Sequence, residues 1–554
     1  MFRPLKDITI GLQRLVQEAI VQSELPQPRE VTIEETRSKK HGDLFTSVAF
    51  KIAKTYKDEL GMGAQEIARL LAMRLSGRAP TIISRVEPVG GYINFFLNRG
   101  EFAKYVLSGI LSCGPKYGAL ERCPYSGKII IEHTSANPIH PLHIGHARNA
   151  FIGDCLTRVF RFLGCEVSTR FYVNDCGKQV AILALAHTIV GEDYEGKSDH
   201  VLGMLYSCMS SIMELKKRIW MLSRLKRAIL GKEEWPNGKS ILRKIRRLRT
   251  MDWREIIDSS MEEGLNSKKI SDYKYAKTLI EEISEWSQVC NEIATKWPEV
   301  FLRLSNRFRI RHLRTIEIIL RAYEKNEKKW ARLVRSLCRK ALDGFLETLN
   351  MLGVRFDAFD WESDLLWSGF VQKTLSMLEE AGYIEQMEGS KARFLDLRKI
   401  LREHPNLART VGLDLEKIEE IKNPALTRRD GSSLYLLRDI AYARFKIEKL
   451  RGRLVLNIIG ADQRLEQLQV LAALVALGYK DVDKRYIHVA YELVHLPGRR
   501  MSSRRGQYIS LDELIEEATA KASEEIQKRY PNLDVGARMA LARAILAPTS
   551  RLGY

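Results

Sequence analysis

The chain has 554 residues, which at roughly 100–200 residues per domain predicts three or four domains. Its 45% apolar and 29% charged residues exclude a wholly disordered or fibrous chain. No apolar run reaches the roughly 18 residues of a membrane span. Lysine and arginine exceed aspartate and glutamate by 20, which favours a polyanionic partner such as nucleic acid. A generally basic surface is the alternative.

The cysteines and the N-terminal sequence both bear on the compartment. Eight scattered cysteines without a CxxC pair argue against a zinc site and against a disulfide scaffold. The N-terminal sequence contains no compact apolar segment followed by a small-residue cleavage site, so no secretory signal is expected. We therefore expect a protein of the reducing cytoplasm with no dedicated metal site.

Residues 1–115 are predicted to form a small α+β domain. Helical periodicity is present in ITIGLQRLVQEAIVQS, in SVAFKIAKTYKDEL and in AQEIARLLAMRLSG, and YINFFL at 92–97 has the composition of a strand. Glycine and proline residues cluster between 114 and 127, which indicates a domain boundary there.

Residues 116–195 are predicted to form the first half of an α/β catalytic domain. KIIIEHTS, from residue 128, is a short β-branched strand of the kind buried in parallel sheets. A Pro-broken turn follows, then a helical run at 147–164 and a second strand at 166–174. Strand, helix and strand in this order open a Rossmann-like nucleotide-binding sheet.

A helical insertion is predicted at 196–345, and the sheet resumes over 346–510 with strands at 454–462 and 486–496. Within the insertion, residues 213–250 hold 13 Lys/Arg against three acidic residues. That stretch is equally consistent with a solvated helical face and with an RNA-backbone surface. Residues 511–554 are predicted to be a short helical C-terminal segment.

The first motif with chemical content is HIGH, residues 143–146, between a buried strand and a helix. A helix start supplies unpaired N–H groups and a partial positive charge, which suit an anion. Gly145 allows a flat base to approach the backbone. His143 and His146 are positioned to address one cluster of phosphate oxygens in a transition state.

The second motif is RRMSSRRG, residues 499–506, which follows a strand and precedes a helix. Four arginines with small hydroxyl residues and a glycine make a cationic loop. Arginine binds phosphate oxygens in a bidentate fashion, so this loop suits a pyrophosphate leaving group. Taken alone, the motif is better interpreted as a basic turn, and only its pairing with the first motif favours the phosphate-binding interpretation.

Together the two motifs resemble the HIGH and KMSKS signatures of class I aminoacyl-tRNA synthetases. Further segments resemble, in the right order, blocks of archaeal-like arginyl-tRNA synthetases, at 131–154, 173–179, 356–364, 430–443 and 460–463. The segments at 41–54 and 90–97 resemble the small tRNA-binding domain that precedes the catalytic domain in this family.

The resemblance implies an arginine–tRNA ligase. Such an enzyme activates L-arginine with ATP, which normally travels with Mg²⁺, and transfers the arginyl group to the 3′ adenosine of tRNA(Arg). By this resemblance, His143 and His146 steady the reacting phosphate and bind ATP together with Gly145 and Met501. The pyrophosphate would be steadied by the cationic loop, namely Arg500, Ser502, Ser503, Arg504 and Arg505.

Family position also assigns an arginine pocket. Glu132 and Asp439 would supply carboxylates for the guanidinium, and Tyr435 its aromatic face. Tyr435 and Asp439 are four residues apart and share a face on a helix. Asn137 and Gln463 would hold the α-amino and carboxylate ends. For Asn174, Asp175 and Gln179, the resemblance implies an active-site wall, and turn and helix-cap duty is the alternative.

The chain departs from the family pattern in several places. Arg500 stands at the first KMSKS lysine and Ser503 at the second, so we expect Arg504 or Arg505 to supply the missing charge. His140 occupies the position where relatives lacking that lysine carry a compensating one. Glu466 stands where the family usually has histidine. Only 48 residues follow Gly506, so we expect most of the helical anticodon-binding domain to be absent, and a monomer.

Two rival functions remain open at this level. One is a noncatalytic tRNA-binding paralogue that has lost the anticodon domain, motivated by the altered loop and the early terminus. The other is a small-molecule nucleotidyltransferase, since such enzymes also carry HxGH. The basic surplus and the N-terminal tRNA-type domain argue against the latter.

Overall fold

The structure is a computed structural model, and it describes residues 3–56, 61–120, 122–191, 194–230, 267–410, 420–492 and 509–552. The chain divides into two compact units. The first comprises Met1–Pro124 with Phe160–Cys165, and the second comprises Tyr125–Val159 with Glu166–Tyr554. Among the described helices, none combines the length and the apolar character that crossing a bilayer requires.

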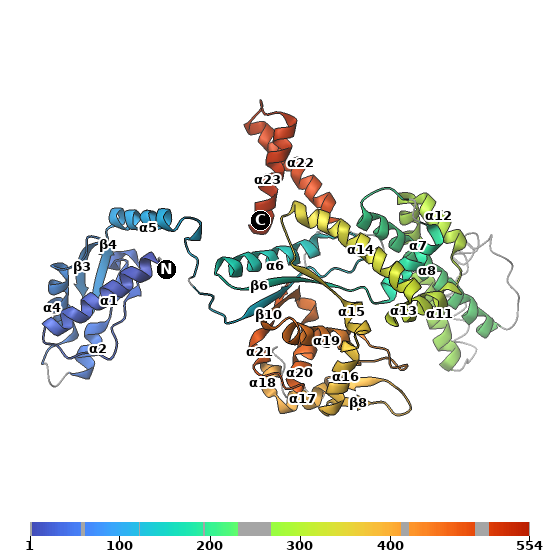
Figure 1. Ribbon diagram of the computed structural model, residues 1–554, viewed down its shortest axis with the longest axis horizontal. Coiled ribbons are helices and arrows are strands. Elements are labelled where there is room, and N and C mark those ends of the chain that lie inside the picture. The colour runs from blue at the N-terminus through green and yellow to red at the C-terminus, as the bar shows by residue number, and fades with distance from the viewer. Residues whose placement is uncertain are drawn as a thin grey trace. The chain divides into compact units, whose positions relative to one another are not determined.

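The first unit packs helices against an antiparallel sheet with strand order β1-β2-β4-β3. Leu12, Val16 and Ile20 recur every fourth residue along its first helix and are buried, so the periodic run forms a helix with one apolar stripe. The predicted α+β character is confirmed. The elements (Figure 1) are α1 (Pro4–Gln22), β1 (Glu34–Glu35), β2 (Leu44–Thr46), α2 (Val48–Thr55), α4 (Ala64–Ser76), β3 (Ile83–Val89), β4 (Tyr92–Leu97) and α5 (Arg99–Cys113).

A disulfide joins Cys123 and Cys165 in this unit. The other six cysteines are free. The sequence argued against a disulfide scaffold, and it did not predict this single bridge. The two cysteines are separated by 42 positions, and no local spacing pattern marks them as partners. The disulfide joins the segment before β5 (Lys128–Glu132) to the residues that follow α6 (Ile144–Phe162).

The second unit is built on a parallel sheet with strand order β11-β10-β5-β6-β7. Every neighbouring pair in this sheet runs parallel. This architecture confirms the predicted Rossmann-like α/β fold. The strands are β5 (Lys128–Glu132), β6 (Val167–Val173), β7 (Ala358–Trp361), β10 (Gly452–Gly460) and β11 (Tyr486–Tyr491).

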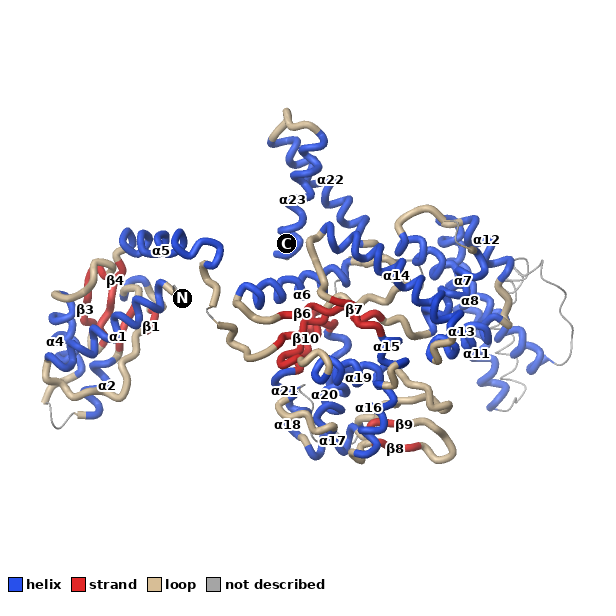
Figure 2. Tube along the Cα trace, viewed as in Figure 1, coloured by secondary structure: helices blue, strands red, loops and turns tan. Residues whose placement is uncertain are grey.

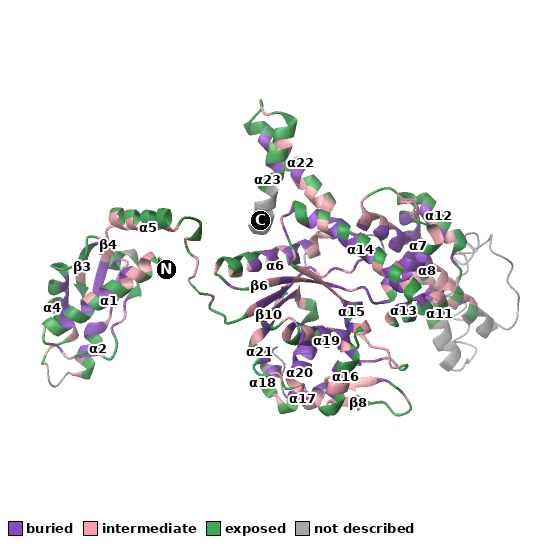
Figure 3. Cartoon of the chain, viewed as in Figure 1, coloured by how far each residue is buried: buried purple, intermediate pink, exposed green. Residues whose placement is uncertain are grey.

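Helices cover both faces of this sheet (Figure 2), which explains why its strands are apolar on both sides. Along β6, Phe171 and Val173 point into one hydrophobic cluster, whereas Tyr172 points into another. The first cluster includes Ala147 and Ala150 of α6 (Ile144–Phe162). The second includes residues of α19 (Tyr435–Glu448) and α20 (Arg464–Ala476). Most residues of β6 and β10 are buried (Figure 3), whereas those of β7 are of intermediate burial.

A helical insertion lies between β6 and β7 in the sequence, as the fold class predicted. Its core shares the first cluster with α6, because Tyr206, Phe308 and Phe345 are buried there. Residues 213–230 of the basic stretch belong to one long helix, and residues 231–250 lie outside the described residues. The helices are α7 (Lys178–Val190), α8 (Ser198–Leu230), α11 (Ser267–Lys296), α12 (Pro298–Arg307), α13 (His312–Glu324) and α14 (Lys328–Met351).

The remaining helices and strands lie between β7 and β11 in the sequence or after β11. The first helix after residue 510 begins at a capping box, in which Ser510 and Glu513 satisfy each other's backbone N–H groups. These elements are α15 (Glu362–Trp367), α16 (Phe370–Glu380), β8 (Ile384–Gln386), β9 (Arg393–Leu395), α17 (Leu397–Glu403), α18 (Pro405–Thr410), α21 (Val482–Arg485), α22 (Leu511–Arg529) and α23 (Val535–Leu552).

Candidate active site

A cavity of about 840 Å³ opens where the parallel strands of the second unit end. Glu132 ends β5 and Asn174 follows β6, while Gly460 ends β10 and Tyr491 ends β11, and all four line the cavity. Ligands of open α/β sheets bind outside the carboxyl ends of the strands. The volume suits a nucleotide-sized or amino-acid-sized ligand.

The HxGH motif forms one wall of this cavity. His143 immediately precedes α6, and His143, Gly145 and His146 all line the cavity. The two imidazole rings stack with centroids 3.8 Å apart. The His143 N–H donates to His146 Nδ1 at 3.2 Å, and the Gly145 N–H donates to His143 Nδ1 at 3.2 Å. Because both Nδ1 atoms accept, each ring carries its proton on Nε2 and has a donor to offer.

These histidines act without charge near neutral pH. Burial lowers the pKa of His143 to about 4, with a smaller contribution from His140. Burial also holds the pKa of His146 well below its usual value, and His143 and His140 lower it further. The sequence placed His140 at a compensating-lysine position, but it is buried, with Nδ1 2.9 Å from the Pro141 carbonyl, and burial lowers its pKa too. The wall therefore offers neutral hydrogen-bond donors.

The structure brings all five proposed arginine-binding residues into the same cavity: Glu132, Asn137, Tyr435, Asp439 and Gln463. Tyr435 and Asp439 lie one turn apart on α19, as their spacing predicted. Gln463 ends the short 3-10 turn that follows β10, and Asn137 donates to Gln179 Oε1 at 3.3 Å.

The Glu132 carboxylate has an internal partner that sequence reasoning missed. Lys446 Nζ donates to Glu132 Oε2 at 2.6 Å and to Asn457 Oδ1 at 2.6 Å. The lysine is buried, and its ammonium lies 4.4 Å from the centroid of the Tyr442 ring. Asp439, Tyr442 and Lys446 follow helical spacing on one face of α19, so that spacing is the signal that was available.

Asp439 is partly exposed in the cavity wall and lies close to other carboxylates. Burial raises its pKa to about 8, and the charges of Glu362 and Glu132 add to the rise, whereas Lys446 and Arg438 oppose it. In the free protein at neutral pH this carboxyl therefore holds a proton. A guanidinium placed beside it favours the ionised form, which couples cation binding to proton release.

The segment after β6 divides between two environments. Asn174 and Gln179 line the cavity, as expected for an active-site wall. Asp175 is not among the lining residues. It accepts hydrogen bonds from the Ser363 N–H at 2.9 Å, from the Ser363 hydroxyl at 2.5 Å and from the Tyr323 hydroxyl. Asp175 thus joins the sheet to the insertion and to α15.

The backbone after β5 adopts a conformation that the sequence did not predict. Thr134 and Ser135 have φ values of 68° and 36°, which non-glycine residues rarely adopt. Asn149 of α6 holds this turn, because its Oδ1 accepts from the Thr134 N–H at 2.7 Å. Its Nδ2 donates to the Ile458 carbonyl at 2.8 Å. The strain is stored directly beside Glu132, and the Ser135 hydroxyl donates to that carboxylate at 3.2 Å.

The proposed cationic loop lies outside the described residues, and with it Arg500, Met501, Ser502, Ser503, Arg504 and Arg505. Both flanks of the loop contact the HxGH region. Arg148 Nη1 donates to the Glu492 carbonyl at 2.9 Å. The Leu511 N–H donates to the Leu142 carbonyl at 2.7 Å, and Ser510 forms an antiparallel bridge with His143. Glu466, which stands at a usual histidine position, lines the cavity.

A parallel sheet with HxGH at a helix start beside its carboxyl edge is the arrangement of a class I aminoacyl-tRNA synthetase catalytic domain. The family described as "tRNA synthetases class I (R), catalytic domain" matches residues 107–218 and 311–547. The "Arginyl tRNA synthetase N terminal domain" matches residues 11–97. The chain belongs to the arginyl-tRNA synthetase family. The interval between the two catalytic-domain matches falls within the helical insertion.

Similar proteins agree with this family. The arginine–tRNA ligase of Sulfurisphaera tokodaii is 33% identical over 82% of this chain and 64% of its own length. That of Ignicoccus hospitalis is 33% identical over 89% of this chain and 68% of its own length. The solved structure of Thermus thermophilus arginyl-tRNA synthetase shares the fold, with a TM-score of 0.54, 22% identity and coverage of 98% of this chain and 74% of that one. The chain thus spans about two thirds of the length of these ligases.

Proposed function

We propose that the chain is an arginine–tRNA ligase. The carboxylate of L-arginine attacks the α-phosphate of ATP, pyrophosphate leaves, and arginyl-adenylate forms. The 3′ adenosine of tRNA(Arg) then takes the arginyl group and releases AMP. The observation that carries the proposal is one cavity that holds Glu132 and Asp439 at one part of its wall and His143 and His146 at another. A planar cation and a phosphate chain fit these two sets of groups.

The proposed roles come from the family resemblance, and the lining of the cavity supports them. Glu132 and Asp439 take the guanidinium, and the ring of Tyr435 packs on it. Asn137 and Gln463 hold the α-amino and carboxylate ends. The arginine carboxylate then lies toward the α-phosphate, so catalysis rests on positioning the two reactants and on stabilising charge.

At the phosphate end, His143 and His146 donate from Nε2 to oxygens that gain charge as the bond to the α-phosphate forms. Gly145 and Met501 complete ATP binding. The pyrophosphate is steadied by the cationic segment, namely Arg500, Ser502, Ser503, Arg504 and Arg505. This assignment is supported by the contacts that both flanks of the segment make with the HxGH region.

Mg²⁺ is expected to arrive with the phosphates of ATP rather than in a protein cage. Among the described residues, two groups could supply three metal ligands. In one, Glu362 already binds Arg438 at 3.2 Å. In the other, Lys197 Nζ already lies 2.6 Å from Asp512 Oδ2. We therefore assign no dedicated metal site.

We also propose the wider arrangement that the family resemblance implies. Residues 1–115 form an additional tRNA-binding domain, residues 116–195 and 346–510 form the two halves of the catalytic domain, and residues 196–345 form the basic insertion. Residues 511–554 begin the helical region that follows the catalytic domain. The partners are tRNA(Arg), L-arginine and ATP, and the protein is a cytoplasmic monomer.

The test is amino-acid-dependent exchange of labelled pyrophosphate into ATP, with and without tRNA(Arg). We expect exchange with arginine, increased by tRNA, and background levels with lysine, glutamate and glutamine. Exchange with one of those three and none with arginine would overturn the proposal. Tight tRNA binding without any adenylate would favour the noncatalytic paralogue instead.

A further inference from the structure

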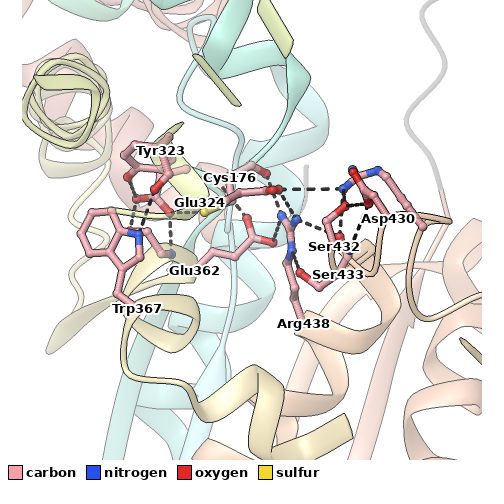
Figure 4. A network of polar contacts seen from close by, with 12 residues as sticks. Cys176, Tyr323, Glu324, Glu362, Trp367, Asp430, Ser432, Ser433 and Arg438 are labelled. Atoms are coloured by element: carbon pink, nitrogen blue, oxygen red, sulfur yellow. Dashed lines mark hydrogen bonds and ion pairs between the residues drawn. The ribbon is translucent and has the colours of Figure 1, made fainter. Parts of the chain in front are cut away.

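Arg438 is a buried cation one position before Asp439, with 1% of its side chain exposed. Its Nη2 donates to Glu324 Oε1 at 2.7 Å, and its Nη1 donates to Glu362 Oε1 at 3.2 Å. Its Nε donates to the Ser433 hydroxyl at 2.9 Å. Figure 4 shows the guanidinium among these partners. Two carboxylates therefore neutralise and orient one planar cation.

The partners of Arg438 come from separate parts of the second unit. Glu324 ends α13 of the insertion, and Glu362 begins α15 directly after β7. They are 114 and 76 residues from Arg438 in the sequence. Because an unpaired buried charge is costly, these three elements are held in one arrangement. The insertion is thereby joined to the helix that carries Tyr435 and Asp439.

The same network fixes the backbone at the edge of the cavity. The Cys176 N–H donates to Glu362 Oε2 at 3.2 Å, and the Cys176 carbonyl accepts from Arg438 Nη1 at 3.4 Å. The backbone N–H and carbonyl of Cys176 are thus both hydrogen-bonded to the Arg438–Glu362 ion pair. Cys176 lines the cavity, so the ion pairs of Arg438 with Glu362 and Glu324 fix the backbone at the cavity wall.

This backbone comes close to the hydroxyl end of Tyr435, the ring proposed to pack on arginine. Gly177 follows Cys176, and a Cβ added at Gly177 would lie 2.8 Å from the Tyr435 hydroxyl oxygen. The space between this peptide and the Tyr435 hydroxyl is therefore too small for a methyl group. A displacement of the Cys176–Gly177 backbone therefore moves the Tyr435 ring or opens a gap beside it.

We propose that Arg438 is a positioning residue for the amino-acid pocket, which holds the Cys176–Gly177 backbone against Tyr435 through its ion pairs with Glu362 and Glu324. This inference rests on the proposed function and adds a residue that acts on arginine binding without touching arginine. It also gives the helical insertion, through Glu324, a part in arginine recognition.

The geometry requires arginine at this position. The guanidinium places three nitrogens in one plane and uses all of them, since Nε and Nη2 both serve Ser433 while the two Nη atoms reach separate carboxylates. A lysine would keep the charge but offers a single nitrogen at the end of a flexible stem. Arg438→Lys therefore removes the planar set of hydrogen bonds and leaves the positive charge in place.

The experiment compares Arg438→Lys with Arg444→Lys in the full chain. Arg444 is a matched control, because it is an equally buried arginine on α19 that pairs with Glu448 at 3.0 Å and donates to Thr374 at 2.7 Å. Neither partner lines the cavity. We expect Arg438→Lys to raise the KM for arginine in pyrophosphate exchange about tenfold or more, with little change in the KM for ATP. Arg444→Lys is expected to leave both KM values near those of the unaltered chain at a similar loss of Tm.

The outcomes separate this inference from the proposed function. If the unaltered chain shows arginine-dependent exchange and the two lysine variants have equal arginine KM values, the positioning role is wrong and the function stands. If the unaltered chain shows no such exchange, the function itself fails. Glu324→Gln covers the case in which Arg438→Lys does not fold. This variant keeps a hydrogen-bond acceptor on α13, so we expect it to raise the arginine KM by a smaller factor than Arg438→Lys does. An unchanged arginine KM would contradict the positioning role of Arg438.

Discussion

The two ends of the cavity use different physics. At the guanidinium end, Glu132 and Lys446 form a buried ion pair, and the charges of both influence the partly exposed Asp439. At the phosphate end, His143 and His146 are neutral donors whose rings are stacked and tautomerically fixed. Under the proposed function, charged groups lie where the substrate would bring a cation, whereas neutral donors lie where a phosphate would gain charge during the reaction.

The difference also bears on selectivity. Under the proposed function, an amino acid without a guanidinium leaves Asp439 protonated and forms no ion pair with it, so the guanidinium end should favour arginine. Under the proposed function, the neutral donors at the other end contact phosphate and add nothing to the choice of amino acid. We therefore expect substitutions at the two ends to separate substrate affinity from turnover.

The largest effect is expected at the guanidinium end, from Asp439→Asn. The amide keeps the shape of the side chain but removes the charge that the guanidinium needs, so kcat/KM for arginine should fall about 1000-fold in pyrophosphate exchange. The KM for ATP should change little. Asp396→Asn, at the start of α17, is the control and should leave both parameters near their starting values. A loss shared equally between arginine and ATP would contradict the assignment.

The next effect concerns the stability of that end. Lys446→Met leaves the Glu132 carboxylate buried without its partner, and we expect a loss of about 3 kcal/mol in the free energy of unfolding. Adding Glu132→Gln should recover more than half of this loss in a double-mutant cycle read by urea denaturation. Lys484→Met, at an exposed lysine 4.0 Å from Asp481, should cost less than about 0.5 kcal/mol. Simple additivity of the two buried changes would show that the pair is not coupled.

The phosphate end should respond in kcat. His146→Ala removes a positioned donor, and we expect kcat for exchange to fall about 100-fold while the arginine KM stays within about twofold. His146→Gln keeps a neutral N–H donor and should retain more activity than the alanine variant. His404→Ala, just after α17, provides a histidine control outside the cavity lining. A raised arginine KM with an unchanged kcat would contradict the assignment of His146 to the phosphate end of the cavity.

Sequence reasoning reached the features that depend on local pattern. The strand–turn–helix around His143 and the shared helical face of Tyr435 and Asp439 follow from spacing within about 20 residues, and both are present. The parallel sheet followed from the apolar strands and is confirmed.

Pairings between distant segments were not predictable from one chain. Arg438 meets Glu324 across 114 residues, and Asp175 meets Tyr323 across 148. Nothing in either local sequence names its partner, because such contacts are set by the packing of whole elements. Asp175 illustrates the limit, since its neighbours in sequence line the cavity while its own carboxylate faces α15 and the insertion.

The smallest predicted effect is a pH dependence confined to one end of the cavity. Asp439 has a pKa of about 8, raised first by burial and then by Glu362 and Glu132, and lowered by Lys446 and Arg438. Below pH 8 the free protein must release this proton to bind a guanidinium with an ionised carboxylate. The affinity for arginine should therefore weaken as pH falls below 8, by at most about tenfold per unit, and level off above 8.

Titration calorimetry of arginine binding in buffers of different ionisation enthalpy measures this linkage directly. Near pH 7 we expect close to one proton released per arginine bound, and none from the Asp439→Asn variant if it still binds. The phosphate end should add no such dependence, because the pKa of His143 is about 4 and its imidazole stays neutral from pH 6 to 9. Exchange at saturating arginine should accordingly vary little over that range on account of the histidines. Proton uptake on arginine binding, or a kcat that follows a histidine titration near pH 6.5, would reverse the contrast between the two ends.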